Sequence, residues 1–377
     1  MNKKEISEIK KQFTPANCAI TRLCGCYVDN EKERKAEFKE AFLSLPEEEM
    51  FKYFELFRKN LSGTLGKNLI NMEFPLAAEN PGSTHDLLMQ LRETRLTDDI
   101  LIDTFYDKVL DSLDEPGNFL ILLIHGLYDI PGKSTDGNEM FDASEEVYSF
   151  VLCCVCPVKL TKAGLCYNAS EGIIQNRIRD WVVDMPLTGF LFPAFNDRST
   201  DIHSLHFYSK DADQFQARLI EDMLGCTPPM PVTSQKEAFQ ALVEDTLGDD
   251  CSFEAVKNIH EKLTEKLEDG KDSPDPAALT KRDLYLLLSD SGADEEHLEA
   301  LDERFEETAG KDASLFASNV INARKFEIKT PDVVVQVKPD RADLVKTMVI
   351  DGQECLVIPL EEHVEVSGIV IKTKSES

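Results

Sequence analysis

Two long apolar runs place the strongest constraint on how this chain can fold. They are FLILLIHGLY at residues 119–128 and VYSFVLCCVCPV at residues 147–158, and Pro, Gly, Asn and Asp residues bound them. Continuous apolar runs of this length are typical of strands covered on both faces, because a strand with one wet face would alternate apolar and polar residues. We therefore predict that these runs are central strands of a covered sheet.

Shorter patterns predict further strands beside these two. Residues 18–28 (CAITRLCGCYV) are rich in small and β-branched residues and follow a Thr14-Pro15 turn. Residues 189–195 and 203–208 are apolar runs of strand length. A covered sheet is the simplest assembly of these segments.

Helical patterns accompany the strands. Ser44-Leu45-Pro46-Glu47 offers an N-cap, a Pro in the first turn and a Glu at the capping-box position, so we expect a helix from there to Gly63. Leucine and isoleucine spacing predicts two helices within 84–113, separated by a turn at 97–99. A further helix is predicted over 211–224, ended by Gly225.

The second half of the chain has a different character. Acidic amphipathic helices are predicted from residue 233, with a polar, Pro-bearing linker at 269–278 and two more helices after it. Strand patterns return from residue 326. Within them Asp351-Gly352 lies between apolar runs, which strongly indicates a hairpin with a type I′ turn.

Together these patterns predict an α+β protein with more than one structural unit. At 377 residues the chain exceeds the roughly 250 residues at which one hydrophobic core usually stops growing. We expect a covered mixed β-sheet with helices, an acidic helical region and a small C-terminal β-unit. The corresponding boundaries are 1–230 for the mixed α and β core domain, 231–317 for the acidic helical region and 318–377 for the β-rich unit.

The charge and hydropathy of the chain exclude several classes of partner. A formal net charge of -29 opposes direct electrostatic binding to nucleic acid, which depends on clustered Lys and Arg. Anionic membranes are disfavoured for the same reason. The longest wholly apolar run, 119–124, is far shorter than the roughly 20 residues of a membrane-spanning helix.

The cysteines and the first residues predict a reducing, cytoplasmic location. The chain has ten cysteines, and its start carries Lys10, Lys11 and Arg22 in place of an apolar signal segment. Thiols stay reduced in such a compartment, so we expect that disulfides do not stabilise the fold.

Several longer phrases of the sequence are specific enough to suggest a family. They are FTPANCAITRLCGCYVD, LSLPEEEMFKYFELFRK, NRIRDWVVDMP, GFLFPAFNDRSTDIHSLHFYSK and KFEIKTPDVVVQVKPDR. Together they resemble the uncharacterised bacterial domain-of-unknown-function family 4317 over most of the chain. The resemblance implies a bacterial, intracellular protein, and it supplies no activity and no catalytic residues.

Two cysteine motifs raise the question of a metal site. Cys24-Gly25-Cys26 and Cys153-Cys154-Val155-Cys156 lack the Cys-x2-4-Cys spacing of structural zinc sites. Buried structural thiols are the favoured interpretation, and a metal or redox site is the alternative. The acidic segment 290–294 lacks the spacing of a calcium loop, so a short helical hairpin is expected there. We predict neither a metal nor another cofactor.

The densest set of reactive side chains lies between residues 176 and 206. Its candidate catalytic residues are Arg177, Arg179, Asp180, Asp197, Arg198, Asp201 and His203. Polar residues between apolar strands often form loops at a sheet end, where ligand sites concentrate. The alternative is that these side chains form ion pairs and turn caps, with Asn196-Asp197 shaping a turn.

Two hypotheses about function follow. The first is a non-enzymatic cytoplasmic interaction or regulatory protein with a protein partner, because no complete catalytic constellation can be assembled. The alternative is a hydrolase or a binding protein for a small anionic ligand that uses the 176–206 cluster. In it Arg177, Arg179 and Arg198 would hold the anion, and Asp201 or His203 would act as acid or base. Oligomeric state and substrate stay open.

Overall fold

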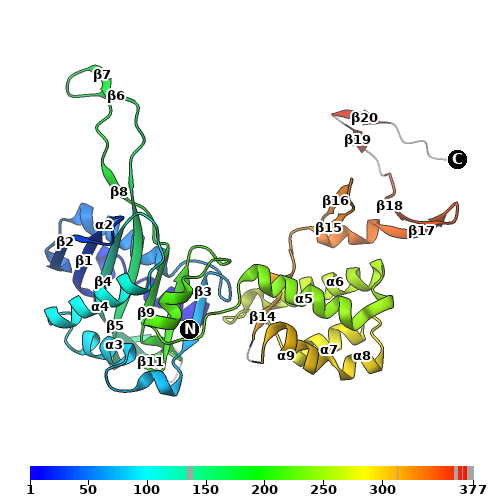
Figure 1. Cartoon of the computed structure of the whole chain (residues 1–377), viewed down its shortest axis with the longest axis horizontal. Helices are drawn as coiled ribbons and strands as arrows, with labels where there is room; N and C mark the ends of the chain where they lie inside the picture. Colours follow the sequence, from blue (N-terminus) through cyan, green and yellow to red (C-terminus); the bar gives the residue numbers. More distant parts are fainter. Residues whose placement is uncertain (134–138, 312, 361–363, 367, 372–377) are drawn as a thin grey trace. The chain divides into compact units, whose positions relative to one another are not determined.

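The computed structural model describes residues 1–133, 139–311, 313–360, 364–366 and 368–371 (Figure 1). The chain divides into two compact units. Unit 1 comprises Met1–Val232 and Pro274–Pro276, and unit 2 comprises Thr233–Ser273 and Ala277–Ser377. Helices and strands are both abundant in the chain, so the predicted α+β class is confirmed.

Unit 1 is built on one large antiparallel sheet. Its strands follow the order β2-β1-β4-β5-β9-β12-β3, and β8 also pairs with β5. The bounds are β1 Ile20–Val28, β2 Arg34–Ala41, β3 Leu69–Glu73, β4 Asn118–Lys133, β5 Glu139–Leu160, β8 Trp181–Val183, β9 Thr188–Phe192 and β12 Ser204–Ser209. The prediction of a mixed sheet, with both parallel and antiparallel strands, is wrong. Hairpin connections such as β1-β2 and β4-β5 make neighbouring strands antiparallel.

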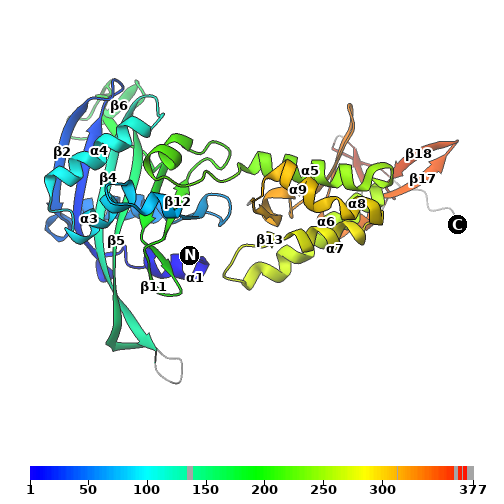
Figure 2. The ribbon, with the colours of Figure 1, turned by 60° about the horizontal axis from the view of Figure 1, so that its bottom comes forward.

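The two apolar runs form the centre of this sheet, as predicted. They lie in β4 and β5, which pair with each other from Asn118 to Lys133 and continue past the shorter strands (Figure 2). Leu122 and Leu123 are both completely buried although they point to opposite faces. Burial on both faces explains why these strands carry no polar alternation.

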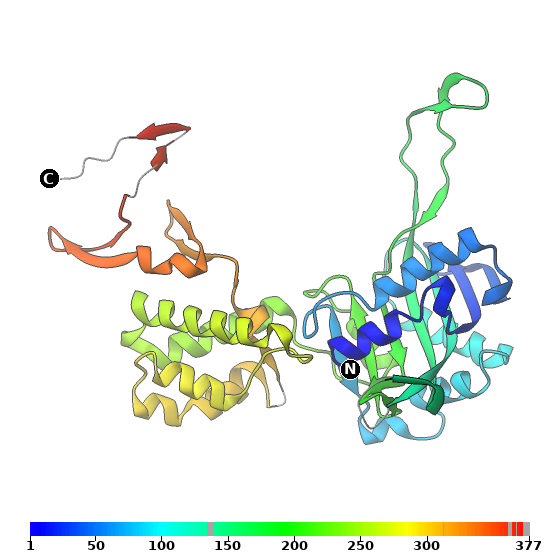
Figure 3. The ribbon, with the colours of Figure 1, turned by 180° about the vertical axis from the view of Figure 1, so that it is seen from behind.

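Helices cover the sheet on both faces. One core lies between the sheet and α3 (Thr84–Glu93), α4 (Asp99–Ser112) and a single π-helical turn at Leu219–Met223. The other lies under α1 (Lys3–Lys10) and α2 (Glu47–Asn60). Figure 1 shows α3 and α4 in front of the sheet, and Figure 3 shows α1 and α2 from behind.

Two helix predictions need correction. The helix after Pro46 exists, but Pro46 itself is the N-cap and no capping box forms, because Ser44 lies in a separate 3-10 turn and donates to the carbonyl of Ala41. The predicted helix over 211–224 is confined to its last turns. At its start the side chain of Asp211 accepts the amide of Asp213, which replaces helical hydrogen bonding.

Unit 2 begins with the predicted amphipathic helices. They are α5 Val232–Leu247, α6 Phe253–Asp269, α7 Lys281–Ser289, α8 Glu295–Glu299, α9 Leu301–Ala309 and α10 Ala317–Val320. Two short strands, β13 (Ala278–Leu279) and β14 (Leu315–Phe316), pair with each other. The predicted linker at 269–278 contains a 3-10 turn at Gly270–Asp272.

The end of unit 2 consists of two-stranded hairpins. They pair β15 (Phe326–Lys329) with β16 (Val334–Val337), β17 (Lys346–Ile350) with β18 (Gln353–Val357), and β19 (Val364–Val366) with β20 (Ile369–Ile371). Asp351 and Gly352 have φ angles of 51° and 77°, the positive values that a type I′ turn requires. The predicted hairpin is therefore confirmed.

Two general features complete the description. Within the described ranges no helix has both the length and the apolar character needed to cross a membrane. All ten cysteines are free thiols, and most of them are buried.

Candidate functional site

The first part of the predicted 176–206 cluster lies in a projecting hairpin. Residues 160–183, called the arm below, leave the sheet at the end of β5 and return at β8. The outer portion of the arm is the ribbon of β6 (Leu165–Asn168) and β7 (Ile173–Asn176). Figures 1 and 3 show the arm extending away from the sheet.

Three of the predicted residues hold the strands of the arm together. The amide of Arg177 donates to the carbonyl of Gly164 at 2.8 Å, and Nε of Arg179 donates to the carbonyl of Thr161 at 2.8 Å. The amide of Asp180 donates to the hydroxyl of Thr161 at 3.1 Å. These contacts are structural, since they join the two strands of the arm in the stretch between the β5-β8 pair and the β6-β7 pair.

Asp197 and Arg198 occupy the turn of another hairpin, formed by β10 (Ala194–Asn196) and β11 (Ser199–Asp201). Both have positive φ angles, 51° and 56°, so this turn also has type I′ geometry. The amide of Asp197 donates to Glu5, and the guanidinium of Arg198 pairs with Glu8 at 2.9 Å. The turn therefore fastens helix α1 to the β10-β11 hairpin.

Asp201 and His203 have partners of their own. The carboxylate of Asp201 accepts the side-chain amide of Asn196 at 2.6 Å and the backbone amide of His203 at 3.0 Å. The imidazole of His203 lies 2.8 Å from the carboxylate of Glu79, and this hydrogen bond raises the pKa of His203. His203 precedes β12, whereas His206 is buried within it and bonds to Asn71.

The seven predicted residues therefore fall into two groups that do not meet. Arg177, Arg179 and Asp180 belong to the arm, and the other four surround the β10-β11 hairpin. In Figures 1 and 3 these two features lie at opposite ends of unit 1. Each group is engaged in turn and strand contacts, and the two together assemble no common anion site.

The most unusual surface of unit 1 is the arm itself. Tyr167 and Ile174 are cross-strand partners on one face of the β6-β7 ribbon and both are exposed. Trp181, the single tryptophan of the chain, is 55% exposed at the base of the arm. The exposed large apolar side chains of the arm are Leu165, Tyr167, Ile173, Ile174, Ile178, Trp181, Val182 and Val183.

Sequence reasoning did not identify the arm, although its pattern contains a usable signal. Asn168-Ala169-Ser170-Glu171-Gly172 is a polar loop between short apolar segments, and Gly172 takes the left-handed conformation at φ 67°. Such a loop with Gly indicates a hairpin of four or five loop residues. The exposure of its apolar residues could not be predicted, because exposure depends on the absence of a covering layer.

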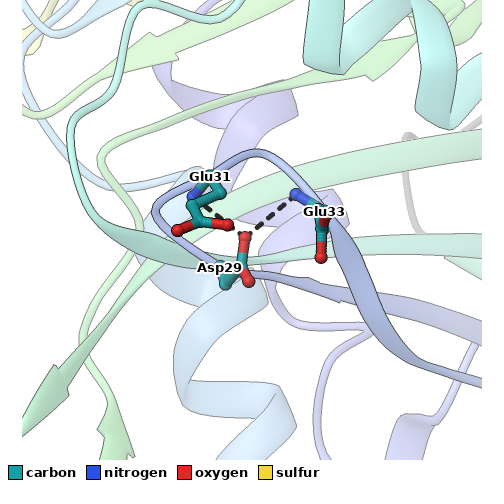
Figure 4. Close-up of side chains that lie close together, drawn as sticks. All are labelled: Asp29, Glu31 and Glu33. Atoms are coloured by element: carbon teal, nitrogen blue, oxygen red, sulfur yellow. Dashed lines mark hydrogen bonds between the residues drawn. The ribbon is translucent and has the colours of Figure 1, made fainter.

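An acidic group in the β1-β2 turn is a candidate cation site. Asp29, Glu31 and Glu33 bring ligand oxygens within 4.8 Å of one another (Figure 4). However, the carboxylate of Asp29 accepts the amides of Glu31 and Glu33, at 2.9 and 3.0 Å, which shapes the turn. The ammonium of Lys35 lies 3.0 Å from Asp29 and also contacts Glu33, so it already offsets part of the negative charge of the cluster.

The cysteine motifs are distributed over both cores. Cys24, Cys26 and Cys153 belong to the core under α3 and α4, whereas Cys154 and Cys156 belong to the opposite core. Burial raises the pKa of Cys24 and of Cys26 to about 11 and raises that of the β5 thiols further. These thiols are therefore protonated at neutral pH and have the character of buried packing groups.

Unit 2 contains a groove of about 580 Å³. Its apolar walls include Phe239, Val243 and Ile259, and His260 lies against Phe326 with ring centroids 5.0 Å apart. Burial lowers the pKa of His260, which keeps its imidazole neutral. The groove contains none of the seven predicted site residues.

Comparison with known proteins identifies a family. Residues 1–369 match the family model described as Domain of unknown function (DUF4317), which covers nearly the whole chain. A search of curated proteins finds no match. The chain belongs to the DUF4317 family, as its sequence phrases indicate.

Proposed function

We propose that this member of the DUF4317 family is a non-enzymatic interaction protein that binds a protein surface through its arm. The observation that carries the proposal is the row of exposed apolar side chains along both strands of the arm, including Tyr167, Ile174 and Trp181. Contiguous exposed apolar surface of this kind marks interaction sites, whereas scattered single residues do not.

The energetics of an isolated hairpin support this proposal. A two-stranded ribbon is at best marginally stable in water, because neither face is packed. Covering a large apolar side chain contributes on the order of 1.5–3 kcal/mol, and aromatic residues are the commonest anchors of interfaces. A partner that covers Tyr167, Ile174 and Trp181 would therefore stabilise the arm and gain affinity from the same contacts.

Charge suggests which surface the arm fits. Within residues 160–183 the basic residues Lys162, Arg177 and Arg179 outnumber the acidic residues Glu171 and Asp180. The whole chain nevertheless carries a net charge of -29. A partner with an acidic surface is complementary to the arm, and we propose that a second copy of this chain is that partner.

The hydrolase alternative has less support. It requires Arg177, Arg179 and Arg198 to hold one anion beside Asp201 or His203. Two of these arginines belong to the arm, while Arg198 is paired with Glu8 at the opposite end of unit 1. We therefore favour the interaction hypothesis.

The proposal is tested by sedimentation velocity of the purified full chain and two double variants. Tyr167→Ser with Ile174→Ser removes a cross-strand apolar pair from the arm. Leu43→Ser with Ile100→Ser is the matched control, since both side chains are exposed in unit 1 away from the arm.

We expect the wild type and the control to form dimers as concentration rises and the arm variant to stay monomeric. A wild type that is monomeric at every concentration would contradict the proposal. Equal dimerisation of the wild type and the arm variant would contradict it as well, because the interface would then lie elsewhere.

A further inference from the structure

A buried histidine at one end of the unit 1 sheet bridges two hydroxyl groups. His125 of β4 is fully buried, with Nδ1 2.6 Å from the hydroxyl of Thr21 and Nε2 3.0 Å from the hydroxyl of Ser149. The Thr21 hydroxyl also lies 3.2 Å from the backbone carbonyl of His125. The three side chains come from different strands, β1, β4 and β5, and form one connected polar group.

A β-bulge makes this arrangement possible. Along the β1-β4 pairing, Ile20 lies opposite Gly126 and Arg22 lies opposite His125, so Thr21 is an extra residue in β1. Bulges of this kind redirect a side chain and are frequent next to functional sites. Here the bulge places the Thr21 hydroxyl on the imidazole.

Three arginines contribute positive charge near the same histidine. Arg22 is its cross-strand neighbour in β1. Arg92 lies in the last turn of α3, which packs against β5, and Arg95 follows in the α3-α4 turn. Burial is the main cause that lowers the pKa of His125 to about 4, and the positive charges of Arg95, Arg92 and Arg22 contribute to the same shift. These three charges make a positive contribution to the electrostatic potential at His125.

Strand alternation places the polar groups on a common face. Arg22 alternates with Cys24, His125 with Leu123, and Ser149 with Val151, and these apolar neighbours all belong to the core under α3 and α4. Helix α3 covers that same face and carries Arg92 in its last turn, and Arg95 follows three residues later.

The three guanidinium groups take no part in the ion pairs that the described residues form. In the described part of the chain no ion pair includes Arg22, Arg92 or Arg95. By contrast, Arg34 and Arg218 of the same unit each pair with acidic side chains. A group of three uncompensated arginines is notable in a chain with a net charge of -29.

The α3-α4 turn holds Arg95 in a restricted conformation. Arg95 and Leu96 have φ angles of 53° and 55°, a left-handed geometry that disfavours side chains with a Cβ and is rare for leucine. Leu96 is completely buried, so its packing fixes the turn and leaves Arg95 exposed at the surface. Such strained turns are found at ligand-binding segments.

We propose that unit 1 binds a phosphate group, either free or as a phosphomonoester, on Arg22, Arg92 and Arg95 beside the Thr21 hydroxyl. Guanidinium groups bind phosphate oxygens in pairs of parallel hydrogen bonds, and they keep their charge at any physiological pH. A bound dianion supplies the negative charge that the protein itself does not place there. The inference is independent of the arm and of the proposed function.

The test is equilibrium dialysis of the full chain with radiolabelled inorganic phosphate at constant ionic strength, and with phenyl phosphate as the monoester. The test variant is Arg92→Gln with Arg95→Gln. The control is Arg282→Gln with Arg324→Gln, which removes the same charge from two exposed arginines of unit 2.

We expect saturable binding of one phosphate per chain. The test variant should lose at least about tenfold in affinity, the equivalent of one good charged hydrogen bond, and the control should change little. If phenyl phosphate binds as inorganic phosphate does, the site takes monoesters; if it does not, the site takes the free ion.

Three outcomes would overturn the inference. They are the absence of saturable binding to the wild type, equal affinity of the wild type and the test variant, and an equal loss in the test and control variants, which would indicate nonspecific attraction. Arg92→Lys with Arg95→Lys keeps the charge and guards against a folding defect. Its affinity for phosphate should lie between that of the wild type and that of the glutamine variant. If the lysine variant is folded but binds phosphate no better than the glutamine variant, the site is contradicted.

Discussion

Acid should destabilise unit 1 through two buried neutral histidines. Burial lowers the pKa of His125 to about 4 and that of His206 to about 3. In the unfolded chain each has a pKa of about 6.5, so each imidazole gains a proton on unfolding once the pH falls below that value. Both contributions to stability are fully present above pH 6.5 and are lost progressively toward pH 4.

The size of this loss can be worked out between pH 7 and pH 5.5. An unfolded histidine goes from about one-quarter to about nine-tenths protonated over this interval, while the folded form stays neutral. Each histidine then lowers the free energy of unfolding by about 1.3 kcal/mol, and both together by about 2.5 kcal/mol. His203 acts in the opposite direction, because its hydrogen bond to Glu79 raises its pKa.

The assay is urea unfolding followed by near-ultraviolet circular dichroism. This signal reports mainly on unit 1, which contains the single tryptophan and every tyrosine except Tyr285. The quantity compared is the change in unfolding free energy between the two pH values. His125→Gln and His206→Gln should each reduce that change by about 1.3 kcal/mol.

His203→Gln is the control and should not reduce the acid sensitivity. The reasoning is refuted if both buried-histidine variants lose as much stability between pH 7 and pH 5.5 as the wild type does.

Three further predictions concern stability. Arg198→Ala breaks the partly buried pair with Glu8 and should lower the free energy of unfolding by about 1–3 kcal/mol in urea titrations; an unchanged melting temperature would argue against it. Gly189→Ala places a Cβ 2.2 Å from a backbone oxygen of β5 and should cost at least about 1–3 kcal/mol in the same assay, whereas Gly164→Ala, which meets nothing within 4 Å, should be nearly neutral. Gly352→Val should reduce hydrogen-exchange protection in β17 and β18, because this position has φ 77°, and unchanged protection would contradict the turn assignment.

The central strands could be predicted from the sequence because both of their faces are buried. The edge strand β2 could not, because most of its residues are exposed. The runs 119–128 of β4 and 147–158 of β5 are apolar at most positions, so their sequence alone indicates strands. β2 (RKAEFKEA) reads as a polar segment, because it lies at the edge of the sheet and exposes most of its residues. Its one aromatic residue, Phe38, lies over Gly25 of β1, a contact that requires knowledge of the strand pairing.

The start of α2 shows how packing can override a local motif. Ser44 and Glu47 have the spacing of a capping box, but Phe42 is completely buried two residues earlier. Burying Phe42 holds residues 42–44 in a 3-10 turn, so the helix begins only after Pro46. A short motif is a weak guide where a large side chain must reach the core.

Closeness in sequence did not indicate which residues of the 176–206 cluster lie close together in space. Asp180 and Asp197 are 17 positions apart in the sequence, yet Asp180 belongs to the arm and Asp197 to the turn between β10 and β11. Conversely, Thr21 and His125 are 104 residues apart and in direct contact. Pairings of this kind come from sheet order and a bulge, which no local pattern in the sequence specifies.

The central claim, that the arm is the interaction surface, is tested most directly by the fluorescence of Trp181. It is the single tryptophan and is 55% exposed at the base of the arm, so its emission reports on the arm alone. We predict that raising the concentration of the full chain shifts the emission to shorter wavelength and reduces quenching by acrylamide, as the dimer forms. An emission maximum and quenching constant typical of a water-exposed indole at every concentration would contradict the account.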